Sequence, residues 1–85
     1  MAELVNYPDH IKFRLSVDED HEGPFTFITE WSGLEISVEP GTWVDVEVDN
    51  GDGTPAQVHV HPGGDIAVFG RRVVVTGEDG ELRTS

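Results

Sequence analysis

The sequence predicts an all-β fold, a small antiparallel β-sandwich or barrel of 7–8 short strands. Three observations support this prediction. Ten glycines and five prolines divide a chain of 85 residues into short segments. Those segments alternate apolar and polar residues with the two-residue period of a strand that has one buried face, and none shows helical spacing. A chain of this length is expected to form one domain, residues 1–85, with a small core.

The first half of the chain contains four expected strands. His10–Val17 places its apolar residues at odd positions, and Phe25–Trp31 is rich in aromatic and β-branched residues. Leu34–Glu39 and Trp43–Asp49 place their apolar residues at even positions, on either side of the turn Pro40-Gly41. Each segment is therefore expected to turn one face toward the core.

The second half contains shorter segments. Asn50–Pro55 is interpreted as a hairpin turn, because Asn and Asp before glycine favour a positive φ. Ala56–His61 follows, with its valines expected to point toward the core and its histidines outward. Asp65–Phe69 and Arg71–Thr76 are β-rich, and Glu81–Thr84 is an eighth candidate strand.

A pairing register follows if consecutive strands form hairpins, because a shift of one residue would expose every valine. Across Pro40-Gly41 this predicts Ile36 opposite Val46 and Glu35 opposite Glu47. Across the next turn, the same reasoning predicts the following facing pairs: Val46 with Val58, Val44 with Val60, Asp45 with His59, and Trp43 with His61.

The charge balance limits the classes of partner. Seventeen carboxylates against five basic residues give a net charge of −12. Such a chain is expected to repel nucleic acid and anionic membrane, and to be attracted to cations or basic proteins. The chain has no cysteine, and no signal peptide or membrane span is expected. The expected location is the cytoplasm, or a virion assembled there.

The stretch VHVHPGGD contains a candidate metal site. His59 and His61 project from one strand face, and two imidazoles with the carboxylate of Asp65 suit Zn²⁺ or a similar ion. Gly53, five residues, His59-x-His61, three residues and Asp65 resemble the first motif of the cupins. The resemblance implies a metal held by these three side chains within a β-barrel. Asp65 replaces the motif's glutamate and the second motif is missing, so the main interpretation includes no cofactor and the metal site is an alternative.

Catalysis has little support in the sequence. The serines lie in no strand-turn-helix context, and no cysteine is present. Carboxylates on an exposed strand face lack the burial that would separate their pKa values. The chain is therefore not expected to be an enzyme.

Several apolar or aromatic side chains are expected to face outward and to form a protein interface. Val73-Val74-Val75 is apolar on both faces, so its middle residue should point away from the core. Tryptophan is enriched among the residues that contribute most to protein interfaces. The candidate interface residues are Trp43, Trp31, Val74 and His61.

Carboxylates also recur at the outward positions of two expected strands. Lys12 and Arg14 are expected to pair with some of them if the first strand is a neighbour. The expected acidic face consists of Glu35, Glu39, Asp45, Glu47 and Asp49.

These observations lead to one main functional hypothesis and two alternatives. The main hypothesis is a small non-enzymatic module for protein interaction or assembly, an accessory or decoration-type subunit such as those of phage particles. Its partner is a protein or a second copy of itself. The first alternative is the cupin-like metal-binding barrel, and the second is an acidic mimic of nucleic acid that inhibits a basic protein.

Overall fold

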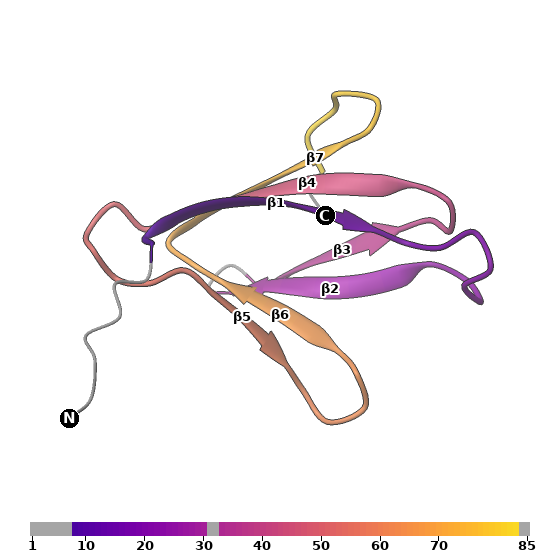
Figure 1. Cartoon of the computed structure of the whole chain (residues 1–85), viewed down its shortest axis with the longest axis horizontal. Coiled ribbons are helices and arrows are strands. Elements are labelled where there is room, and N and C mark those ends of the chain that lie inside the picture. The colour runs from indigo at the N-terminus through magenta and orange to yellow at the C-terminus, as the bar shows by residue number, and fades with distance from the viewer. Residues whose placement is uncertain (1–7, 31–32, 84–85) are drawn as a thin grey trace.

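The computed structural model describes residues 8–30 and 33–83 and confirms the predicted all-β fold. These residues form seven strands in two sheets packed as a sandwich (Figure 1). The strands are β1 (His10–Ser16), β2 (Phe25–Glu30), β3 (Leu34–Val38), β4 (Trp43–Asp49), β5 (Gln57–Val60), β6 (Ile66–Phe69) and β7 (Arg72–Gly77). The eighth candidate strand is represented only by a bridge between Thr76 and Leu82.

The two sheets differ in size. The smaller sheet has the order β1-β4-β7 and is antiparallel throughout. The larger sheet has the order β3-β2-β6-β5, and within it β2 and β6 run parallel. Figure 1 shows β5 at the outer side of the larger sheet, where it diverges from β1. The larger sheet therefore has one strand more than the smaller sheet that faces it.

The core lies between the sheets and is built from the alternating apolar positions. Phe27, Val46, Val48 and Val68 are completely or almost completely buried. The alternation therefore gave the correct inward face for β4, whose residues Val44, Val46 and Val48 are all buried. The buried core cluster also includes Val17, Ile36, Val38, Val44 and Val75.

The predicted hairpin across Pro40-Gly41 is wrong. β3 pairs with β2, so Ile36 lies opposite Phe27 and Glu35 opposite Ile28. β4 pairs with β1 and β7, so Val46 lies opposite Phe13 and Val75. The short connection carries the chain from one sheet to the other. A strand with one apolar face can bury that face in either of two arrangements. It can lie beside the next strand in the same sheet, or it can face the next strand across the sandwich, and the sequence pattern is the same in both cases.

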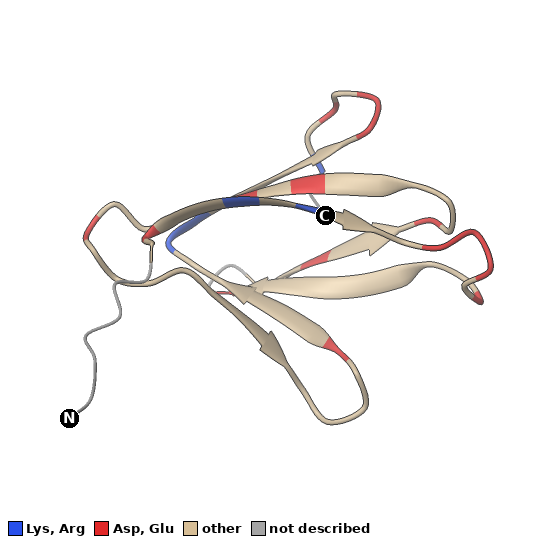
Figure 2. Cartoon of the chain, viewed as in Figure 1, with Lys and Arg blue, Asp and Glu red and all other residues tan. Residues whose placement is uncertain are grey.

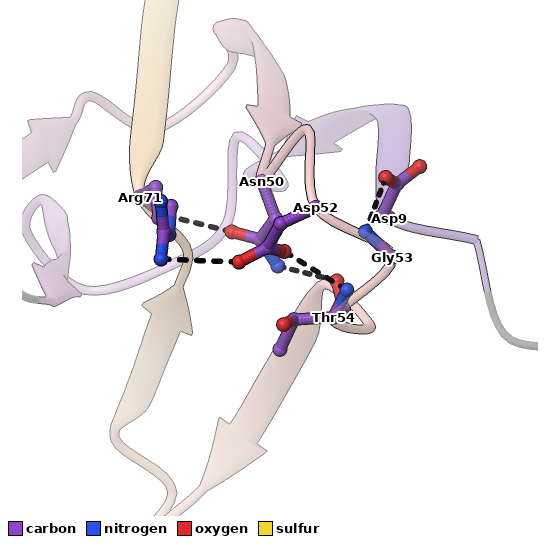
Figure 3. A network of polar contacts seen from close by, with 6 residues as sticks. All are labelled: Asp9, Asn50, Asp52, Gly53, Thr54 and Arg71. Atoms are coloured by element: carbon purple, nitrogen blue, oxygen red, sulfur yellow. Dashed lines mark hydrogen bonds and ion pairs between the residues drawn. The ribbon is translucent and has the colours of Figure 1, made fainter.

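The predicted hairpin across Asn50–Pro55 is also wrong, because this segment connects β4 in the smaller sheet to β5 in the larger one. Polar contacts fix the crossing (Figure 3). The Asn50 amide donates to the carbonyl of Thr54 and accepts from the backbone N–H of Arg71, both at 2.7 Å. Asp9 accepts from the N–H of Gly53 at 2.9 Å. The crossing is thereby tied to the start of β1 and to the β6–β7 connection.

Candidate interaction surface

The most exposed apolar side chains in any described strand lie on β5. Val58 is 44% exposed and Val60 is 72% exposed. Among the described residues, β5 is an edge strand that pairs only with β6. A shallow hollow lies beside its first half, lined by the segment 55–59. We call the outer side of β5, with Val58 and Val60, the β5 edge.

Val58 and Val60 do point toward the core side of the sheet as predicted, but the expectation that they are buried there is wrong. Val58 lies opposite Val68 and Val60 lies opposite Ile66, so both valines are on the core side of the larger sheet. Directly opposed residues of paired strands share a face. The valines remain exposed because the smaller sheet has only three strands and does not extend over β5.

The backbone of β5 has a defined orientation toward its free side. The N–H of His61 donates to Asp65 at 2.7 Å and so continues the ladder toward β6. Antiparallel pairing alternates between residues that bond to one neighbour and residues whose N–H and C=O point the other way. Val58 and Val60 therefore point their N–H and C=O groups outward. Ala56 has the same orientation, and its N–H donates to Pro8 at 3.1 Å.

The β5 edge lies in a segment without formal charge. The chain has 17 carboxylates, yet positions 53–64 contain no Asp, Glu, Lys or Arg. Figure 2 shows β5 and the turn that follows it in tan, without the red or blue of charged residues. Charged side chains would have discouraged edge-to-edge contact here.

The structure does not bring the candidate metal ligands together as a cluster. Across residues 8–30 and 33–83, no group of three His, Asp or Glu side chains is arranged to hold a metal ion. The ring of His59 packs against Phe69, with centroids 4.5 Å apart, and His59 hydrogen-bonds Gln57 at 2.6 Å. The backbone N–H of His61 donates to the carbonyl of Asp65, so these two residues close the tight turn between β5 and β6. His59 thus lies on the edge strand β5 and His61 directly follows it, and both residues are exposed to solvent.

The outer face of the smaller sheet carries paired charges. Arg14 makes two hydrogen bonds to Asp45, at 2.8 and 3.1 Å, and its guanidinium lies 3.5 Å from the ring centre of Trp43. His10 donates to Glu47 on the same face. The expected facing pairs of Asp45 with His59 and of Trp43 with His61 are therefore wrong, because the neighbour of β4 is β1. The expectation that β1 supplies cations to these carboxylates is confirmed for Arg14.

These contacts shift two carboxyl groups. The hydrogen bond from Arg14 lowers the pKa of Asp45 below its ordinary value. The hydrogen bond from His10 lowers the pKa of Glu47 in the same direction. Both groups are therefore held in their charged form, and nothing in this arrangement provides the raised pKa that a general acid at neutral pH needs.

The five residues of the expected acidic face are divided between the two sheets. Glu35 projects from β3 in the larger sheet, and Glu39 lies in the connection that follows. Asp45, Glu47 and Asp49 lie on β4, beside the cations of β1 and β7. The expected opposition of Glu35 and Glu47 is wrong, since these residues belong to different sheets. The carboxylates therefore do not form one continuous phosphate-like row.

The expected interface residues lie in different places. Val74 does point away from the core, opposite Glu47, and it is half-buried in a shallow hollow on the outer face of the smaller sheet. Trp43 is half-buried on the same face. His61 is exposed directly after the β5 edge. Trp31 lies outside the described residues.

Sequence reasoning did not identify Val58 and Val60 as surface residues. The absence of charge over positions 53–64 was the available signal, and it indicates a surface suited to contact. No helix in the described part of the chain is long and apolar enough to span a membrane. No protein-family model, curated protein or solved structure matches the chain.

Proposed function

We propose that the protein is a small non-enzymatic module that acts by protein contact, with the β5 edge as its main contact surface. The observation that carries this proposal is the combination of outward N–H and C=O groups with the exposed valines Val58 and Val60. Such an edge can accept a strand from another chain, because backbone hydrogen bonds supply affinity and side chains supply specificity.

The other sheet edges support this choice by contrast. β1 presents Lys12 and Arg14 along its length, and β3 presents Glu35. Charged residues on an edge discourage pairing with another chain. β7 is partly covered by the chain that follows it, through the Thr76–Leu82 bridge. Among the described edges, β5 alone is uncharged and carries strongly exposed valines.

Such a module would serve as an accessory or decoration-type subunit of a larger assembly, including phage particles, located in the cytoplasm or in a virion formed there. The high negative charge elsewhere keeps the free protein soluble and directs contact to the uncharged edge. His61 lies beside that edge. Trp43 and Val74 remain predicted contact residues on the outer face of the smaller sheet, and Trp31, outside the described residues, remains a predicted contact residue.

Site-specific photocrosslinking tests the proposal. A photoreactive amino acid is placed at Val60 and, as the matched control, at Leu82, which is 65% exposed and lies far along the chain from β5. Both proteins are irradiated in extracts of cells that naturally contain the protein. A discrete adduct at position 60 that is missing at position 82 supports the β5 edge. Adducts missing at position 60, or equal at both positions, contradict it.

No observation favours the two alternatives to the same degree. A metal-binding function would need a third ligand close to His59 and His61, which the described residues do not provide. A nucleic-acid mimic would need carboxylates in one row, whereas Asp45 and Glu47 are paired with basic side chains. We therefore retain protein contact as the proposed function.

A further inference from the structure

The partner that best fits the β5 edge is a second copy of this chain. We infer that two copies associate by antiparallel β5–β5 pairing centred on His59, which joins two four-stranded sheets into one continuous sheet. This inference rests on the proposed function, since it names the partner of the same edge.

Hydrogen-bond parity selects the centre of the pairing. When the two-fold axis passes through His59, Val58 of one copy lies opposite Val60 of the other, and both residues point their N–H and C=O groups toward the partner. Each such pair exchanges two hydrogen bonds, which gives about four in total. A shift of one residue would set Val58 and Val60 opposite residues whose backbone N–H and C=O groups point toward β6. The outward N–H and C=O groups of the valines would then find no hydrogen-bond partner.

Shifts of two residues are also less favourable. A shift in one direction places Val58 opposite Pro62, which has no N–H to donate. The opposite shift places Val60 opposite Ala56, whose N–H already donates to Pro8. The pairing centred on His59 is therefore the one that uses every free group of Val58 and Val60.

The side chains agree with this register. Val58 and Val60 lie on the core side of the sheet, so each valine meets a valine of the other copy and removes apolar surface from water. His59 meets its own equivalent on the opposite face, beside Phe69. Figure 1 shows β5 diverging from the smaller sheet, and among the described strands β5 pairs only with β6.

The charge pattern favours an identical partner over a basic one. Two molecules of net charge −12 repel each other over most of their surfaces, but positions 53–64 carry no formal charge. A basic partner would be drawn to the carboxylates instead. Since salt screens the repulsion, added salt is expected to strengthen self-pairing and to weaken any contact based on opposite charges.

Single cysteines test the register, because the natural chain has none. In His59→Cys the two Cα atoms are about 4.5 Å apart in the proposed pairing, within the range that a disulfide needs. In the matched control Gln57→Cys, on the same strand and face, the two cysteines are about 14 Å apart. On oxidation with diamide, we expect disulfide-linked dimer to form at least about tenfold faster in His59→Cys than in Gln57→Cys.

Sedimentation velocity measures the association without a cross-link. An edge of four residues makes a small interface, so we expect a weak and reversible dimer. Its fraction should rise as the protein concentration increases from about 10 µM to 1 mM, and it should rise with added salt. Val60→Lys should abolish the dimer. Leu82→Lys, which makes the same change of charge at a similarly exposed site, should leave it unchanged.

Two results would overturn the inference: a wild-type monomer at every concentration and salt level, or equal cross-linking rates for His59→Cys and Gln57→Cys. The photocrosslinking experiment separates this failure from failure of the proposed function. A monomer that still forms an adduct at position 60 with a different polypeptide retains the β5 edge as a binding surface and refutes only self-pairing. A monomer with no adduct refutes both.

Discussion

Replacing Asn50 by alanine is expected to destabilise the whole domain, because this side chain ties the crossing between the sheets to the β6–β7 connection. Asn50 is only 7% exposed. Its amide donates to the Thr54 carbonyl and accepts from the Arg71 N–H, both at 2.7 Å. Alanine removes both bonds and leaves two backbone groups without their partner at a part-buried site.

The size of the effect follows from those two groups. A buried polar group that loses its partner costs about 1–3 kcal/mol, and these two groups are only part-buried. Each therefore contributes in the lower part of that range, and the expected loss in the free energy of unfolding is about 2–4 kcal/mol. A domain of this size has a total stability of roughly 4–13 kcal/mol, so the loss is a large fraction of it. The expected fall in Tm is about 10–30 °C.

Urea unfolding followed by tryptophan fluorescence measures this loss, with thermal unfolding by circular dichroism as a second readout. Ser37→Ala is the control, since it removes one exposed side-chain hydrogen bond to Thr26 and should cost less than about 0.5 kcal/mol. If Asn50→Ala costs no more than Ser37→Ala, the crossing is held by something other than the Asn50 contacts.

Three further predictions concern packing, charge and metal. In Gly70→Ala the added carbon would lie 2.2 Å from a buried methyl of Val48, so urea unfolding should show a loss of about 1–3 kcal/mol or more in the free energy of unfolding. Gly77→Ala is the control and should cost less, because its added carbon meets only the movable end of the Arg83 side chain. In Arg14→Met the pKa of Asp45 should rise, as followed by NMR titration. Because the folded-state pKa of Asp45 is lowered, this carboxylate contributes stability above about pH 4, and the contribution is lost as the pH falls through the folded-state pKa. Acid should therefore destabilise Arg14→Met less than it destabilises the wild type. An equal dependence of stability on pH in the two proteins would refute this. Neither a chelator nor added Zn²⁺ should change Tm, and a rise with Zn²⁺ would restore the metal site at His59 and His61 as a candidate.

The fold class was predictable because alternation records which face of a strand is buried. Val44, Val46 and Val48 are apolar at every second position of β4, and all three are buried. Alternation does not record which strand lies alongside, since the pairing of β4 with β1 brings together residues about thirty positions apart. Local turns were the only guide to pairing in the sequence, and here both turns proved to be crossings between sheets.

The candidate surface was less predictable for a related reason. Val58 and Val60 follow the same pattern as core valines and do face the core side. Their exposure depends on how many strands the opposite sheet contains, which is a property of the whole arrangement. The lack of charge around them was visible in the sequence, but it became informative only once β5 was known to be an edge.

Amide hydrogen exchange at the β5 edge tests the central claim most directly. NMR measures exchange of the Val58 and Val60 amides, which point outward, against the His59 amide, which points toward β6. At about 20 µM, where a weak dimer is largely dissociated, we expect fast exchange at both valines and slower exchange at His59. Near 1 mM, we expect the valine amides to become protected. Valine amides protected equally at both concentrations, in a protein that sedimentation velocity shows to be monomeric at about 20 µM, would mean that this chain covers its own edge, and would contradict the claim that β5 is open to another molecule.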